Sequence, residues 1–231
     1  MVLITSFEPF SGGKKNNSMM VAQAVTQKLK KELTINHCQL TTSFDLAAQE
    51  IIDCINNLPE APRVIISIGE GYCNRVSLET RAINLDKSEG PDNSGVSRNN
   101  SPIYPEAPEH LGLNINWSAG YCSLPEKLKK FTQPSSDAGR FVCNNTMYHM
   151  AYSHHYTPFG FIHVPNHKCK EKQQNTREVI EIVSHMIKTT AARNLEDIKP
   201  YPTDKEQIND TIQNSDDRCE KTFLTELLKT Y

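Results

Sequence analysis

The chain has 231 residues, which is long enough to bury a sizeable core in one α/β domain or two small ones. Its 25 Lys and Arg residues nearly balance its 27 Asp and Glu residues, and the net charge of −2 gives no electrostatic reason to expect nucleic acid or an anionic membrane as a partner. No apolar run approaches the ~20 residues that span a bilayer.

The N-terminus and the cysteines are the features that bear on the compartment. The first ten residues lack a basic region followed by a long apolar one, so they predict a strand rather than a secretory signal. Seven cysteines, an odd number without regular spacing, do not indicate a disulfide framework. We therefore expect free thiols in a reducing compartment, and a cytoplasmic protein.

Strands and helices alternate through the first seventy residues. The predicted order is a strand (residues 2–6), a helix (19–32), a strand (37–42), a helix (47–58) and a strand (63–68). Ser18 is a possible cap for the first helix. This alternation is typical of a sheet flanked by helices.

Residues 85–116 break that rhythm, because they are rich in proline and asparagine and show little periodicity. We interpret them as a long ordered excursion over the face that carries the site. Beyond it, the sequence predicts helices over residues 125–131, 139–152 and 175–192 and a strand over residues 159–164.

The last forty residues differ in character. Residues 194–214 are polar and predict a linker, whereas residues 215–217 can cap a short amphipathic helix. That helix must dock on its own domain or on a neighbouring subunit. We expect a main domain over residues 1–192, and over 193–231 a polar linker with an amphipathic C-terminal helix.

Cys143 is a candidate nucleophile. It lies early in a predicted helix that Ser136 or Asp137 can cap. A free thiol has a pKa of ~8.5, and a helix N-terminus together with a nearby imidazolium can lower that pKa until the thiolate is the main form. The alternative is a buried cysteine that fills core space, which is the favoured interpretation for an arbitrary cysteine.

Two further residues could complete a catalytic group. His163 lies at the carboxyl end of a predicted buried strand, where α/β proteins place their sites, and its ring needs a hydrogen-bond partner there. Glu79 is a carboxylate in a half-apolar strand. Taken separately, His163 is about as well explained as a satisfied core histidine, and Glu79 is more simply a solvated or structurally paired acid.

Other motifs are weaker. The Gly69-Glu70-Gly71 segment has Asn74 where a dinucleotide fingerprint needs its third glycine. His163, His167 and Cys169 lack the paired spacing of a metal site. We therefore expect neither a metal nor a cofactor.

Four segments together resemble the pyroglutamyl peptidase I family, also called pyrrolidone-carboxylate peptidases. They are residues 7–12 with Asn16 and Ser18; Glu79 with residues 81–84, 91–93 and Gly95; residues 136–144 around Cys143; and residues 160–165 around His163. The matches occur in the same order as in the family, and the last two are specific.

The resemblance implies a three-layer α/β/α sandwich with a mostly parallel, twisted central sheet. It also implies a cysteine exopeptidase (an omega peptidase) that removes an N-terminal pyroglutamyl residue from peptides through a thioester. Cys143 would be the nucleophile, His163 the base and Glu79 the group that orients the base. The family further suggests a homotetramer or a dimer.

The same resemblance assigns a substrate pocket. Pyroglutamate is a lactam with two apolar faces, one N–H, one ring carbonyl and no ammonium group, so its pocket needs aromatic walls and few polar partners. By resemblance, the substrate-binding residues are Phe7, Phe10, Asn16, Glu70, Phe141 and Val142.

Two alternatives remain at this point. Residues 69–75 and the pair Glu89-Gly90 depart from the family pattern, and these changes leave room for a cysteine hydrolase with another small N-terminal or amide substrate. The C-terminal helix leaves room for a non-catalytic homologue used for binding or assembly.

Overall fold

The computed structural model describes residues 1–154, 157–169, 176–193 and 199–231. The strands are β1 (Val2–Phe7), β2 (Ile35–Leu40), β3 (Val64–Gly71), β4 (Val76–Glu79), β5 (Arg81–Ile83), β6 (Asp86–Lys87), β7 (Asn99–Ser101), β8 (His110–Gly112), β9 (Thr132–Ser135) and β10 (Phe159–Pro165). The helices are α1 (Asn17–Leu29), α2 (Ala47–Asn56), α3 (Ser118–Ser123), α4 (Glu126–Lys129), α5 (Val142–Ser153), α6 (Thr176–Ala191), α7 (Lys205–Asn214) and α8 (Arg218–Leu228).

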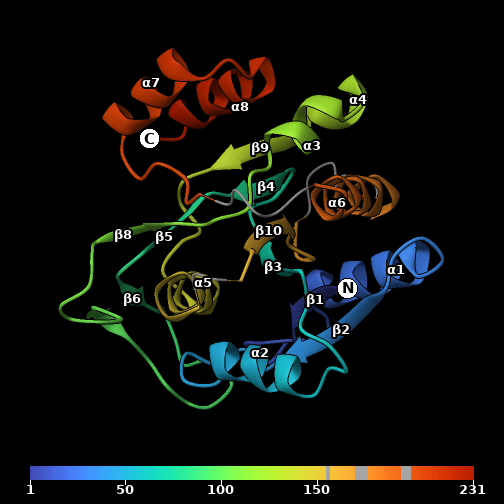
Figure 1. Cartoon of the computed structure of the whole chain (residues 1–231). Coiled ribbons are helices and arrows are strands. Elements are labelled where there is room, and N and C mark those ends of the chain that lie inside the picture. Colours follow the sequence, from blue (N-terminus) through green and yellow to red (C-terminus); the bar gives the residue numbers. More distant parts are fainter. Residues whose placement is uncertain (155–156, 170–175, 194–198) are drawn as a thin grey trace.

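A six-stranded sheet in the order β2-β1-β3-β10-β4-β9 forms the middle layer (Figure 1). The pairing of β10 with β4 is antiparallel, and the other four pairings in this sheet are parallel. The central strands β1, β3 and β10 are apolar almost throughout and buried on both sides, as expected for a parallel sheet covered by helices. This confirms the predicted α/β/α sandwich.

Two hydrophobic clusters lie on opposite faces of the sheet because side chains alternate along each strand. Ile4 and Ile66 point into a cluster with α1, α3, α6 and α8, whereas Leu3 and Ile65 point into a cluster with α2 and α5. Figure 1 shows these two helical layers on either side of the strands. Of the predicted helices and strands, those in the first seventy residues are confirmed with shifts of a few residues at their ends.

Several local predictions are wrong for identifiable reasons. Asn16, rather than Ser18, caps α1, because the Asn16 side chain accepts from the Ser18 backbone N–H. Helix α5 begins at Val142 without a side-chain cap, since Asp137 bonds within its own loop instead. Residues 205–214 form α7, capped by Asp204, although a linker was predicted there. Residues 194–198 of that predicted linker lie outside the described part of the chain.

The excursion over residues 85–116 also differs from expectation. It contains the short strands β6, β7 and β8, and its apolar residues Val96, Ile103 and Leu111 pack against the cluster formed with α2 and α5. It therefore lies along the layer that contains α2 and α5. None of its described residues lines the pocket around Cys143.

The C-terminal helices dock on their own domain. Helix α8 packs on α3 and β9, with the Phe223 ring 5.6 Å from the Tyr121 ring. The Tyr201 hydroxyl accepts from the Trp117 backbone N–H at 2.6 Å. Of the two docking sites that the sequence left open, the terminal helix therefore uses its own domain.

The expectation of free thiols is wrong for four of the seven cysteines. Cys38 on β2 is bonded to Cys54 on α2, and Cys73 is bonded to Cys169 at a sequence separation of 96. The spacing along the chain could not indicate these pairs, because each joins segments that meet only in the folded protein. Cys122, Cys143 and Cys219 are free thiols. Among the described residues, no helix is both long and apolar enough to cross a membrane.

Candidate active site

The register of three adjacent strands brings His163 and Glu79 together. His163 on β10 lies opposite Gly69 of β3 and Ser77 of β4. Glu79 is the last residue of β4, and one of its carboxylate oxygens lies 2.8 Å from Nδ1 of His163. Glu79 is fully buried and His163 nearly so, so this hydrogen bond fixes the ring without competition from solvent.

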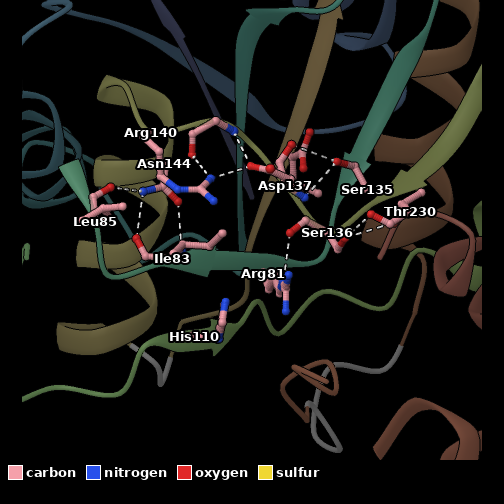
Figure 2. Close-up of polar contacts among 12 residues, drawn as sticks. Arg81, Ile83, Leu85, His110, Ser135, Ser136, Asp137, Arg140, Asn144 and Thr230 are labelled. Atoms are coloured by element: carbon pink, nitrogen blue, oxygen red, sulfur yellow. Dashed lines mark hydrogen bonds and ion pairs between the residues drawn. The ribbon is translucent and has the colours of Figure 1, made fainter. Parts of the chain in front are cut away.

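Cys143 is the second residue of α5, and its neighbour Asn144 anchors that end of the helix. The Asn144 side chain accepts from the Ile83 backbone N–H at 2.8 Å and donates to the carbonyl groups of Ile83 and Leu85 at 2.8 and 3.1 Å (Figure 2). These bonds tie the start of α5 to the chain that follows Glu79. The residue before the helix, Phe141, has an extended backbone conformation and is the last residue of the loop that follows β9.

The Cys143 sulfur is within hydrogen-bonding distance of His163. Burial by itself would lower the pKa of His163, but the charge on Cys143 and the hydrogen bonds from Cys143 and Glu79 outweigh it and raise that pKa from 6.5 to about 10. A ring with that pKa is an imidazolium at neutral pH when it faces a thiolate. The three predicted residues therefore lie together as one hydrogen-bonded group.

Two glycines of β3 make room for this group. A Cβ atom on Gly71 would lie 2.7 Å from Cβ and 2.8 Å from Cγ of His163, and one on Gly69 would lie 2.9 Å from the Cys143 sulfur. Sequence reasoning considered Gly69 and Gly71 as part of a rejected dinucleotide motif and of the altered family loop over residues 69–75, and it gave them no role in packing against the catalytic residues. Their role is to let the nucleophile and the base approach the backbone of β3.

We expect Gly71→Ala to displace the His163 ring and to destabilise the fold by about 1–3 kcal/mol, because the added methyl group would overlap Cβ and Cγ of His163. Denaturant unfolding gives the stability, and the rate of Cys143 alkylation reports the displaced ring. Gly90→Ala is the matched control, since Gly90 is exposed with nothing within 4 Å of the added methyl. Equal stability and equal alkylation in the two variants would contradict this account of Gly71.

A pocket of about 220 Å³ opens beside Cys143. Its lining residues are Phe7, Phe10, Asn16, Thr42, Glu70, Gly71, Tyr72, Ala138, Gly139, Arg140, Phe141, Cys143 and His163. The Phe10 and Phe141 rings lie 5.9 Å apart and form an aromatic wall. Five of the six predicted substrate-binding residues therefore line one pocket. The exception is Val142, which is fully buried in the core cluster with α2 and α5.

The two polar residues predicted for this pocket are already engaged within the protein. The Asn16 amide donates to the Glu8 carbonyl at 2.9 Å and accepts from the Ser18 N–H at 2.9 Å. The Glu70 carboxylate accepts from the Asn17 N–H and lies 2.9 Å from Nδ1 of His167. These bonds hold the start of α1 against the end of β3, so the folding role of both residues is clear.

Sequence reasoning missed Thr42, Tyr72 and Arg140 as lining residues. Arg140 had a usable signal, because it belongs to the same segment as Cys143. Its guanidinium lies 2.6 Å from Asp137. Tyr72 also had a signal, because it belongs to the altered loop over residues 69–75. Thr42 carries no signal in the sequence, since it reaches the pocket from the loop that follows β2.

The weaker motifs are resolved by their contacts. Cys169 is in a disulfide with Cys73, and His167 faces Glu70, so neither joins His163 in a metal site. In the described ranges, no group of three His, Cys, Asp or Glu residues is arranged to hold a metal ion. Glu89 and Gly90 are exposed and lie outside the pocket lining, whereas Glu70, Gly71 and Tyr72 of the altered loop belong to it.

The arrangement suits nucleophilic catalysis. A thiol on the first turn of a helix faces a ring that can take its proton, and a buried carboxylate holds the far side of that ring. The first backbone N–H groups of α5 have no partner four residues earlier, so they are available to an oxyanion. The pocket beside them is mainly apolar and admits a small group.

Comparison with known proteins gives consistent results. The family model for pyroglutamyl peptidases matches residues 1–195. Pyrrolidone-carboxylate peptidase 1 of Caldanaerobacter subterraneus subsp. tengcongensis is 31% identical over 172 residues, covering 71% of this chain and 81% of that protein. The pyrrolidone-carboxylate peptidase of Gloeobacter violaceus is 34% identical over 180 residues, covering 71% and 80%.

A solved structure has the same fold. The crystal structure of Bacillus amyloliquefaciens pyroglutamyl peptidase I superposes with a TM-score of 0.69 at 25% identity, covering 83% of this chain and 97% of that one. Pyrrolidone carboxyl peptidase from Thermus thermophilus superposes with a TM-score of 0.67 at 23% identity, which is a likeness of fold. The matched segment of the family ends before α7 and α8.

Proposed function

Because this chain belongs to the pyroglutamyl peptidase family, we propose that it is a cysteine peptidase that removes an N-terminal pyroglutamyl residue from peptides, with Cys143, His163 and Glu79 as its catalytic group. The observation that carries the proposal is the hydrogen-bonded group of these three side chains beside the aromatic pocket.

The reaction proceeds in two steps. The thiolate of Cys143 attacks the carbonyl carbon that joins pyroglutamate to the next residue, and the His163 imidazolium protonates the leaving amine as the C–N bond breaks. Water, deprotonated by the neutral His163 ring, then attacks the thioester. The C–S bond breaks, pyroglutamate leaves, and the thiolate–imidazolium pair is restored.

Glu79 acts through His163. Its carboxylate accepts the hydrogen bond from Nδ1, which directs Nε2 toward the sulfur and favours the charged ring. The backbone N–H groups at the start of α5 would receive the negative charge that develops on the substrate oxygen.

The engagement of Glu70 favours a lactam over a free N-terminal amine. A pocket for an ammonium group needs an unpaired carboxylate or several free acceptors. The carboxylate of Glu70 is instead bonded to Asn17 and His167. The remaining wall is provided by Phe7, Phe10 and Phe141, which match the apolar faces of the pyroglutamyl ring. The role of Asn16 as a substrate contact stays a prediction.

A substrate panel tests this specificity. We expect pyroglutamyl arylamide to be cleaved with a kcat/KM at least about 100-fold above that of glutaminyl or prolyl arylamide, because an ammonium group would be buried without a partner. Comparable turnover of a substrate with a free amine would instead favour the hydrolase with a changed acyl group. Absence of any turnover, with Cys143 no more reactive toward alkylation than Cys122, would favour the non-catalytic homologue.

We further propose that residues 1–192 form the peptidase domain and residues 193–231 an extension docked on it. A homotetramer or dimer and a cytoplasmic location stay predictions. The premise of free thiols that suggested a reducing compartment does not hold for Cys38, Cys54, Cys73 and Cys169. Size measurement in solution, with and without a reductant, tests the oligomer.

A further inference from the structure

The last two residues of the chain contact the segments that carry the catalytic residues. The Ser136 hydroxyl donates to the Thr230 carbonyl at 3.1 Å and lies 3.0 Å from the Thr230 hydroxyl. The Tyr231 ring lies under the Arg81 guanidinium, whose Cζ is 4.1 Å from the ring centroid. Thr230 and Tyr231 lie beyond the segment that matches the family, so these contacts belong to the extension.

Arg81 and Ser136 are themselves bonded to each other. The Arg81 Nε donates to the Ser136 carbonyl at 2.8 Å, and its Nη1 donates to the Thr203 carbonyl at 2.5 Å. Figure 2 shows Ser136 between Arg81 and Thr230. Ser136 is only 1% exposed, so its hydroxyl depends on Thr230 as a partner.

Arg81 and Ser136 are each connected to the active site through a short segment of the chain. Arg81 follows Glu79 by two residues, and the intervening Thr80 donates its N–H and its hydroxyl to the Ser135 carbonyl, each at 2.9 Å. Ser136 begins the loop that continues to Cys143. Residues 138–141 of that loop form one wall of the pocket.

On the side of Ser136, the loop is also held by the Ser135 hydroxyl, which donates to the Asp137 carbonyl and accepts from the Asp137 N–H, each at 3.3 Å. Asp137 accepts from the Gly139 N–H at 2.9 Å and from Arg140, and these bonds are internal to the loop. Arg140 is bonded through its carbonyl to the Lys87 N–H at 2.8 Å. A loop held at both ends is ordered before the substrate arrives, and binding then does not have to order it.

We propose that Thr230 and Tyr231 are positioning residues of the active site, which fix the pocket wall of residues 138–141 by holding Ser136 and Arg81. This inference rests on the proposed function. It adds to the site two residues that lie outside the segment matched by the family model. Thr230 and Tyr231 are absent from the pocket lining, so they act only through Ser136 and Arg81. Their loss should weaken substrate binding more than it slows the chemistry of Cys143.

The test compares KM and kcat for pyroglutamyl arylamide. We expect Tyr231→Ala, and a chain that ends at Lys229, to raise KM by about five- to tenfold with kcat changed by less than about twofold. Tyr231→Ala loses the cation–π contact with Arg81, and the shortened chain also loses the buried hydrogen bond between Ser136 and Thr230. Tyr231→Phe keeps the ring and should restore the wild-type KM. Thr225→Val is the matched control, because Thr225 is exposed on α8 and its hydroxyl bonds within the helix at 2.7 Å.

We call Thr230 and Tyr231 the tail. An unchanged KM in both Tyr231→Ala and the chain that ends at Lys229, while the wild type cleaves the substrate, would overturn the inference. An equal fall in kcat and stability with an unchanged KM would likewise overturn it, because it would make the tail a structural element alone. If the wild type cleaves no pyroglutamyl substrate, the proposed function fails. The tail is then tested by the ratio of Cys143 alkylation rates with a bulky and a small reagent, which should rise about threefold or more without the tail and stay constant if the inference is wrong.

Discussion

Cys143→Ala is expected to lower kcat for pyroglutamyl arylamide by about 10⁴-fold or more, because removal of a nucleophile leaves only binding and the oxyanion groups to assist water. The variant should fold normally, since Cys143 is half-buried at the edge of a pocket and alanine is accommodated in the first turn of α5. The initial rate of arylamine release, measured beside thermal unfolding, checks both expectations.

Two controls sharpen this result. Cys122→Ala removes a free thiol outside the pocket and should retain full activity. Cys143→Ser keeps a hydroxyl group in place but not a thiolate, and it should remain severely impaired because an alcohol is far harder to ionise than a thiol. Retention of more than about one per cent of the wild-type rate in Cys143→Ala would remove Cys143 from the mechanism.

Glu79→Gln is expected to lower kcat by about 10³- to 10⁴-fold, because the amide no longer stabilises the imidazolium and can hold the wrong tautomer of His163. The buried carboxylate and the ring share one hydrogen bond of 2.8 Å, so the isosteric replacement tests its charge with little change of shape. Glu126→Gln is the matched control, since Glu126 is an exposed acid that pairs with Lys129 on the surface.

The same variant predicts a change in the pH profile. In the wild type, the raised pKa of His163 means that the imidazolium is retained through neutral pH and is lost as the pH rises through about 10. Removal of the carboxylate lowers this pKa, so the alkaline fall in kcat/KM should move to lower pH in Glu79→Gln. A profile that does not move would show that Glu79 does not act on the charge of His163.

Much of the fold could be predicted because periodicity and catalytic chemistry are local properties of the sequence. The apolar strand over residues 63–68 and the helix over residues 47–58 need only their own residues to be recognised. Cys143, His163 and Glu79 could be proposed from the resemblance, and the sheet register then brings strands β4 and β10 together. Parallel order within the sheet followed from the alternation of strands and helices.

The remaining features depend on contacts between distant residues. The bond between Cys73 and Cys169 and the pairing of Glu70 with His167 each join positions almost a hundred residues apart. Val142 was placed in the pocket by its neighbours in sequence, but the first turn of α5 directs it into the core. Helix α7 has a mostly polar sequence that is typical of a linker, and only its Asp204 cap and the buried Ile208 distinguish it.

The most direct test of the account is the rate at which iodoacetamide alkylates Cys143, followed by mass spectrometry in the wild type and in His163→Ala between pH 6 and 8. We expect fast alkylation across this range in the wild type, and a slow reaction that increases with pH in His163→Ala, because the imidazolium keeps the wild-type sulfur charged. Equal rates that increase alike with pH in both proteins would contradict the thiolate–imidazolium pair on which the proposed mechanism depends.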